Sequence, residues 1–198
     1  MLPKAFLHMG PQGVLALDQN PWRGYRVVLS HISDVALNDH TVIDLEPENE
    51  WSGNKLLRAA TIARFKKHLQ RSLDTMKSSG TCNHSIIFQT VAAEANRLAA
   101  SGAATKYLIV VSDLMEHSTV SFYDRTTLTT LQSNPDRITK QLETITPLSS
   151  LANMQVWLLN SPGSYEQNTT YMIVAGFYKH HLEAKGAQVH INTKFQAL

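Results

Sequence analysis

The hydrophobic pattern of the chain centres on a run of apolar residues, YLIVV, within the segment Lys106–Ser118. A short apolar run without polar alternation is typical of a strand that is buried on both faces of a parallel sheet. We therefore predict a central strand over Lys106–Asp113. Ligands of open α/β sheets bind at the carboxyl ends of the strands, so Asp113 marks the expected position of a site.

Two shorter apolar segments in the first half predict a β-hairpin. Tyr25–Ile32 is rich in Val and Leu, and Thr41–Glu46 sets apolar residues among polar ones before Pro47. The connection between them is short, which favours antiparallel pairing. A long amphipathic helix is expected over Asn54–Lys77, because its apolar residues recur at intervals of three and four: Ile62, Phe65, Leu69, Leu73 and Met76.

The second half of the chain alternates helical and strand patterns. Helices are expected over 86–100, from Asp124 onward with an interruption around Pro135 and a continuation to Ile145, and over 169–185 with an end at Gly186. Strands are expected at Met154–Leu159 and, as an edge strand, at Gln188–Phe195. The order predicts an α/β fold with a doubly wound, mostly parallel sheet of the Rossmann type, an antiparallel edge hairpin and helices on both faces.

The first 24 residues form the least regular part of the chain, because Pro3, Pro11 and Pro21 interrupt them. Within them we favour a short helix over Gly13–Asp18, and a short strand that ends at Asp18 is the alternative. At 198 residues, of which 43% are hydrophobic, the chain has the size of one domain over 1–198. Residues 1–24 would then be a truncated or irregular N-terminal segment of it.

Charge and cysteine content exclude several classes of function. The formal net charge is +2, from 18 basic and 16 acidic residues, which is too balanced for a dedicated nucleic-acid-binding protein. A local exception is the polar face of the helix at 54–77, which is expected to be solvated, with an anionic partner as the alternative: Arg58, Arg64, Lys66, Lys67 and Arg71. A single cysteine, Cys82, excludes an internal disulfide and a multi-cysteine zinc site, and it favours a cytoplasmic location. No apolar stretch approaches a membrane span of about 20 residues.

Two motifs resemble those of von Willebrand factor A-like domains. The segment TCNHSIIFQTVAAEANRLA is similar to the family's threonine-loop segment, with Ser85 at the Thr position. The segment LIVVSDLMEHS resembles the strand whose Asp, here Asp113, completes a metal site. The resemblance covers roughly Tyr25–Phe195, and it implies a protein-binding role in adhesion or assembly.

The chain departs from this family at its first strand. The family carries Asp-x-Ser-x-Ser there, which binds a divalent cation, and this motif is absent from the sequence. The resemblance therefore implies a degenerate site in which Asp113 and Ser85 are the remaining metal ligands, with Mg²⁺ as the candidate ion and no other cofactor expected. If 13–18 is a helix, the central first strand is also missing. Buried backbone groups beside Ile109–Val111 would then need a partner from 13–18, from a preceding segment or from a neighbouring chain.

We expect a non-enzymatic protein-binding module with a contact surface on the loops around Ser85, 113–119 and 161–167. The ligand-binding residues would be Ser85, Asp113, Met115, His117 and Ser118, with Phe122 and Tyr123 as further apolar contacts. The alternative is a purely structural role, in which Asp113 caps the loop that follows it, Ser85 caps the next helix and the apolar residues pack inward. The alternative function is a hydrolase that uses Ser85, His84, Asp113 and His117. His180 and His181 are expected at the surface.

Overall fold

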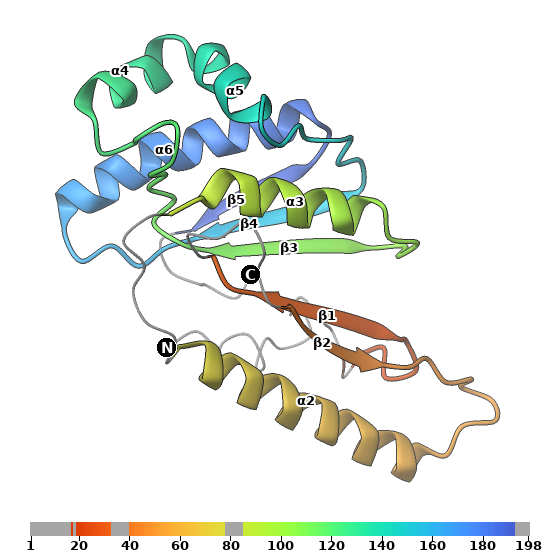
Figure 1. Ribbon diagram of the computed structural model, residues 1–198. Helices are drawn as coiled ribbons and strands as arrows, with labels where there is room; N and C mark the ends of the chain where they lie inside the picture. Colours follow the sequence, from red (N-terminus) through yellow and green to blue (C-terminus); the bar gives the residue numbers. More distant parts are fainter. Residues whose placement is uncertain (1–16, 18, 33–39, 78–84, 193–198) are drawn as a thin grey trace. The chain divides into compact units, whose positions relative to one another are not determined.

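The computed structural model describes residues 17, 19–32, 40–77 and 85–192, and the chain divides into two compact units (Figure 1). Unit 1 comprises Met1–His31, Asn38–Thr81 and Phe195–Leu198, and unit 2 comprises Ile32–Leu37 and Cys82–Lys194. The expectation of a single domain stays a prediction. Among the described residues, no helix is long and apolar enough to cross a membrane.

Unit 1 contains the predicted hairpin and the predicted long helix. Strands β1 (Tyr25–Ser30) and β2 (His40–Leu45) pair in antiparallel register with Val27 opposite Ile43, and α2 spans Lys55–Lys77. The Asn54 side chain caps α2 by accepting hydrogen bonds from the N–H groups of Leu56 and Leu57 at 2.9 and 3.2 Å. The apolar face of the helix and the inward residues of the hairpin form one core: Leu17, Ile43, Leu45, Ile62, Phe65 and Leu69.

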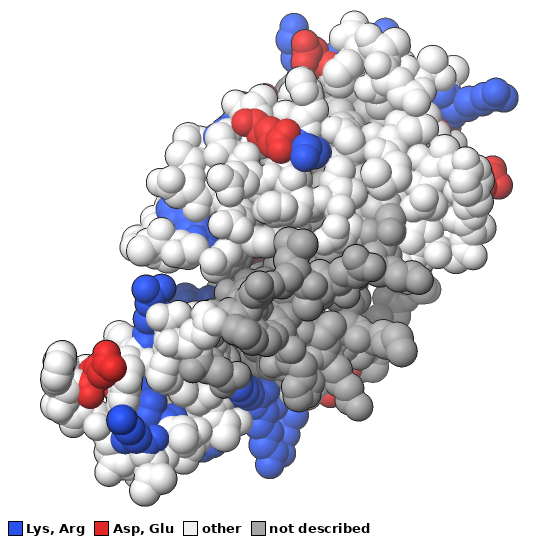
Figure 2. Space-filling view, turned by 180° about the vertical axis from the view of Figure 1, so that it is seen from behind, with Lys and Arg blue, Asp and Glu red and all other residues white. Residues whose placement is uncertain are grey.

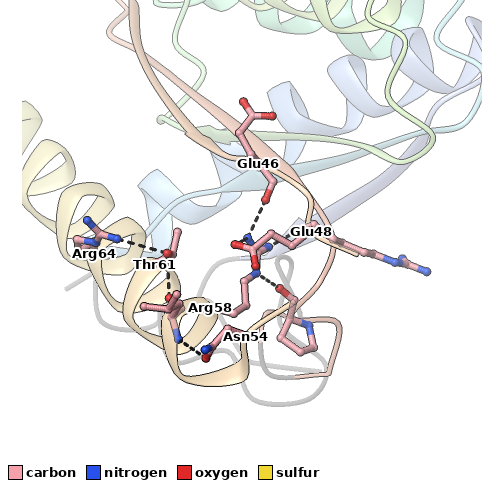
Figure 3. A network of polar contacts seen from close by, with 9 residues as sticks. Glu46, Glu48, Asn54, Arg58, Thr61 and Arg64 are labelled. Carbon is pink, nitrogen blue, oxygen red and sulfur yellow. Dashed lines mark hydrogen bonds and ion pairs between the residues drawn. The ribbon is translucent and has the colours of Figure 1, made fainter. Parts of the chain in front are cut away.

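Arg58 is the exception to the predicted solvated face of α2, because its side chain is only 2% exposed. Figure 3 shows its guanidinium group among backbone carbonyls of the segment that surrounds the hairpin. Nε donates to Pro21 O, Nη1 donates to Glu46 O at 2.7 Å, and Nη2 donates to Arg23 O at 2.7 Å. Nη1 also lies 3.3 Å from Glu48 Oε1. Arg58 therefore stabilises unit 1 from within and does not belong to a binding surface.

The other basic residues on α2 remain on or near its surface. Arg64, Lys67 and Arg71 are exposed, and Lys66 is half-buried. On the face drawn in Figure 2, most of the described surface is uncharged, and acidic and basic side chains form small scattered groups. An anionic partner for this helix stays a prediction. Arg58 would not contact it, because its side chain is buried.

Unit 2 contains a parallel sheet and the remaining helices. Its elements are α3 (Ile87–Ala99), β3 (Lys106–Val111), α4 (Arg125–Ser133), α5 (Pro135–Glu143), β4 (Met154–Leu159), α6 (Tyr165–Ala184) and β5 (Gln188–Asn192). The predicted break near Pro135 is confirmed, since Pro135 is the first residue of α5, where its missing N–H leaves no bond unmade. Gly186 ends α6 with φ of +97°, as predicted for a C-terminal glycine.

The strand order β3-β4-β5 corrects the position that we predicted for Lys106–Asp113. Both pairs are parallel, with Ile109 beside Trp157 and Trp157 beside His190. β3 has β4 as its only neighbour among the described residues, so it is an edge strand of this sheet and not a central one. β5 forms the other edge, as predicted. The hairpin β1–β2 forms a separate two-stranded sheet.

The helices of unit 2 pack on one face of its sheet, where Figure 1 shows α3, α4, α5 and α6 on the same side. Alternate strand residues enter the core beneath them: Val110, Met154, Val156, Leu158 and Val189. All four helices contribute to this core, for example through Val91, Leu131, Leu142 and Val174. The mixed α/β class is confirmed, whereas a doubly wound sheet with helices on both faces stays a prediction.

His181 on α6 is buried, contrary to the expected surface position, and its exposed fraction is 4%. Its Nε2 lies 3.3 Å from Glu143 Oε1 without full hydrogen-bond geometry, and Lys185 Nζ lies 2.8 Å from the same oxygen. Burial lowers the pKa of His181. The imidazole also packs against Phe88 and Phe177, so it is a core residue at the junction of α5 and α6.

Arg58→Ala is expected to lower the free energy of unfolding of unit 1 by about 3–5 kcal/mol, because it leaves the Pro21, Arg23 and Glu46 carbonyls without their shared donor. Chemical denaturation of both proteins measures the difference. The control is Arg64→Ala on the exposed part of the same helix, which should change stability by less than about 0.5 kcal/mol. Equal effects of the two substitutions would contradict the role assigned to Arg58.

Candidate functional site

The candidate site lies on the loop that follows β3, at the carboxyl edge of the parallel sheet. The N–H of Ser112 donates to Leu159 O at 3.1 Å, so the ends of β3 and β4 lie side by side. The Ser112 hydroxyl then accepts from the N–H of Leu114 at 3.0 Å, and Asp113 Oδ1 accepts from the N–H of Met115 at 3.0 Å. These bonds turn the chain sharply where it leaves the sheet.

Leu114 shows how tightly this turn is held. Its φ is +62°, in the left-handed region that most residues avoid, and its side chain is fully buried. Core packing of Leu114 and the side-chain bonds of Ser112 and Asp113 together stabilise the conformation. The capping role considered for Asp113 is thus confirmed, although its side chain is also exposed to solvent.

The structure brings Ser85 and His117 together, as the sequence predicted, but through the backbone. The N–H of His117 donates to Ser85 O at 2.9 Å in an isolated bridge between the start of α3 and the loop. Ser85 does not cap α3: the helix begins at Ile87, Ile86 occupies the capping position, and no side-chain cap bond is made there. The expected capping role of Ser85 is therefore wrong.

Glu116 performs that role from 28 residues away in the sequence. Its Oε2 accepts a hydrogen bond of 2.7 Å from the N–H of Phe88 in the first turn of α3, and the residue is fully buried. A carboxylate is favoured at this end of a helix, because unpaired N–H groups and the helix dipole point toward it. Sequence analysis missed Glu116, since the only local signal is an acidic residue two positions beyond a buried leucine.

Burial changes the pKa of the Glu116 carboxyl group. Desolvation raises the pKa of Glu116 above its ordinary value of about 4.5. The N–H groups of Phe88 and Ile87 oppose that rise, as does the nearby Ser118 hydroxyl, which lacks full hydrogen-bond geometry. Desolvation is the larger effect, so the protonated form gains in the folded state.

Tyr178 on α6 lies beneath the same loop. Burial raises the pKa of its hydroxyl well above the usual range, and the charges of Glu116 and Asp113 act in the same direction. Its ring packs against Phe88 at a centroid distance of 6.2 Å. Within the described residues neither the Tyr178 hydroxyl nor Glu116 Oε1 makes a hydrogen bond. The loop, α3 and α6 thus meet around a buried group of polar atoms.

The rim of the site is aromatic and polar. Tyr123 is 62% exposed and lies edge-on to the His117 ring at 5.9 Å, whereas Phe122 is fully buried in the core. Met115 is half-buried against the core, and Ser118 is half-buried in the loop. Of the three residues predicted to form an apolar contact surface, Tyr123 is exposed, Met115 is half-buried and Phe122 is buried.

The second predicted loop, 161–167, follows β4, but only residues 161–164 lie outside α6, because the helix begins at Tyr165. The Ser164 hydroxyl accepts from the N–H of Gln167 at 3.1 Å, and Gln167 Oε1 accepts from the N–H of Gly163 at 2.8 Å. This reciprocal cap fixes the entry into the helix. It leaves Tyr165 86% exposed next to the carboxyl ends of the strands.

The predicted metal and hydrolase residues are only partly accounted for. In the described part of the chain, no group of three or more His, Cys, Asp or Glu side chains is placed to hold a metal ion. His84 and Cys82 lie outside the described residues, so the hydrolase constellation is described only for Ser85, Asp113 and His117.

Comparison with protein-family models, curated proteins and solved structures gives no match for this chain. The resemblance to von Willebrand factor A-like domains therefore rests on the order of the elements and on the two sequence motifs.

Two substitutions distinguish the contribution of the Glu116 hydrogen bond to stability from the contribution of its charge. Glu116→Ala is expected to cost about 1–3 kcal/mol, because the buried N–H of Phe88 loses its acceptor. Glu116→Gln keeps an acceptor oxygen without the charge. Because the folded-state pKa is raised, wild-type stability relative to Glu116→Gln is highest below about pH 4.5 and falls as the pH rises through the folded-state pKa.

Urea denaturation of the wild type and of Glu116→Gln from pH 4 to pH 8 measures this dependence. His181 is present in both proteins, so its own titration cancels in the difference. Parallel stability curves over the whole range would contradict a raised pKa at Glu116.

Proposed function

We propose that unit 2 is a non-enzymatic protein-binding module whose partner contacts the loops at the carboxyl ends of β3 and β4. The observation that carries this proposal is the pair of exposed aromatic residues, Tyr123 on the loop after β3 and Tyr165 at the start of α6, next to segments that are held by internal hydrogen bonds. Tyrosine is enriched in the centres of protein interfaces, because it offers a large contact area at a low entropic cost. A rigid loop lowers that cost further.

The polar groups of the site favour a binding role over a catalytic one. Asp113 Oδ1 holds the N–H of Met115, and Glu116 Oε2 holds the N–H of Phe88. The hydrogen bond between Ser85 and His117 joins a backbone N–H to a backbone carbonyl, so it positions the loop. These carboxylates and this bridge maintain the shape of the loops.

The assignment to a divergent von Willebrand factor A-like domain, with a role in adhesion or assembly, is part of the same proposal. It is supported by the two motifs and by the position of Asp113 directly after β3. The separate hairpin sheet and the position of β3 at a sheet edge weigh against it. The protein-binding proposal depends on the loops and does not require the family assignment.

A photo-crosslinking phenylalanine derivative in place of Tyr123 is expected to join the chain to one discrete partner protein in cells that produce it. The matched control is the same derivative at Gln132, which is exposed on α4 away from the loops. Mass spectrometry of the adducts identifies the partner. Adducts of equal yield at both positions, or none at position 123, would refute the proposed contact surface.

With the purified partner, Tyr165→Ala is expected to weaken binding by about 2 kcal/mol, roughly thirtyfold in Kd, as for a tyrosine at the centre of an interface. Isothermal titration calorimetry measures the change. Gln132→Ala should leave the Kd unchanged. If Tyr165→Ala binds the partner with the same Kd as the wild type, the start of α6 does not belong to the proposed contact surface.

A degenerate metal site predicts that Mg²⁺ and Mn²⁺ leave the melting temperature unchanged up to millimolar concentration. Asp113 Oδ1 is already bonded to a backbone N–H, so one carboxylate oxygen is committed to the turn. Thermal unfolding at increasing metal concentration provides the measurement. A melting temperature that rises with the metal concentration would show that the folded chain binds the ion.

A further inference from the structure

The outer edge of β3 presents backbone groups that make no hydrogen bond to any residue that the structure describes. In a strand, the N–H and C=O groups of successive residues point alternately to the two sides. The bond from the N–H of Ser112 to Leu159 O shows that the even-numbered residues point toward β4. Tyr107, Ile109 and Val111 therefore point their N–H and C=O groups away from β4, and in the described part of the chain none of them makes a hydrogen bond on that side.

Within β3 itself, several features that protect sheet edges are absent. Natural edge strands avoid further pairing through charged residues, proline or bulges. β3 has the sequence KYLIVV and pairs with β4 in unbroken register from Lys106 to Val111. Its one charged side chain is turned aside, because Lys106 Nζ donates to Ala99 O at 2.6 Å. Tyr107 and Val111 remain 38% and 48% exposed.

The side chains on both faces of β3 favour an apolar neighbour. On one face Leu108 and Val110 belong to the core beneath the helices. On the other face an aromatic row begins at the edge, with Tyr107 5.6 Å from Trp157 and Trp157 stacked on His190 at 4.8 Å. An added strand with apolar residues at alternate positions would extend one of these layers.

We propose that the edge of β3 receives an extended segment of a partner protein, which joins the sheet as a further strand. Such addition gains main-chain hydrogen bonds at Tyr107, Ile109 and Val111, and the alternate side chains of the segment provide specificity. The proposal is independent of the loop surface described above, because it depends on the backbone of β3.

A second copy of this chain fits this edge less well than a single strand. Neighbouring strands lie about 4.8 Å apart, whereas packed helices need about 8–10 Å between their axes. α3 packs along β3, so antiparallel pairing of β3 with its own copy, which puts both α3 helices on the same face, would bring them too close. An extended peptide without a covering helix avoids this clash.

Amide hydrogen exchange, followed residue by residue by NMR, tests the proposal. In the dilute free protein, exchange at Tyr107, Ile109 and Val111 should be at least roughly tenfold faster than at Leu108 and Val110. The probe is an eight-residue peptide that alternates Val and Thr between terminal lysines. It should slow exchange at the three outward residues by roughly tenfold or more, and a version with proline at alternate positions should not.

Ile109→Pro supplies the matched variant. It removes an outward N–H that makes no bond to β4, so the fold should be retained while protection by the peptide is lost at Tyr107 and Val111. Ile109→Val should behave as the wild type. If Ile109→Pro does not fold, Val111→Pro near the strand end replaces it.

Three results would overturn the proposal. Exchange that is unaffected by millimolar peptide would show that the edge does not accept a strand. Slow exchange at the outward residues of the dilute free chain would show that the chain covers its own edge. Protection that grows with protein concentration without peptide would assign the edge to a second copy. The crosslinking outcome at Tyr123 affects none of these results.

Discussion

The need of buried polar groups for hydrogen-bond partners shapes both units of this protein. In unit 2 the first turn of α3 lies beneath the loop after β3, where water cannot satisfy its N–H groups. The Glu116 carboxylate accepts from Phe88 there, and this one bond ties the loop to the helix. Because the loop is held at this point, the Asp113 turn and the exposed Tyr123 also have defined positions.

In unit 1 the buried groups that need partners are carbonyls, and a positively charged residue, Arg58, donates hydrogen bonds to them. The irregular segment before β1 and the segment after β2 carry carbonyl groups that neither a helix nor a strand satisfies. Arg58 gathers three of them with the planar array of donors that only a guanidinium group offers. Each unit therefore has a buried ionisable residue whose hydrogen bonds hold irregular chain in place: Arg58 in unit 1 and Glu116 in unit 2.

The outer edge of β3 carries further backbone groups that make no hydrogen bond to any described residue. Tyr107, Ile109 and Val111 lie in a mostly apolar strand that pairs with β4 in unbroken register, and the Lys106 amine donates to a carbonyl of α3. The loops at the carboxyl end of the sheet and the outer side of β3 are thus two different kinds of surface. One offers rigid aromatic side chains, and the other offers main-chain hydrogen bonds.

Local pattern alone was enough to determine the elements: the hairpin, the long helix, the break at Pro135 and the end of α6 at Gly186 follow from residues close in sequence. The turn at Asp113 after β3 was also predictable, because an apolar strand that ends in a polar residue is a local signal. Only the tertiary structure decided the strand order, the cap that Glu116 provides to α3 across 28 residues, and the burial of Arg58 against Pro21 across 37. Periodicity reports which face of an element is apolar, and it carries no information on which distant segment lies against that face.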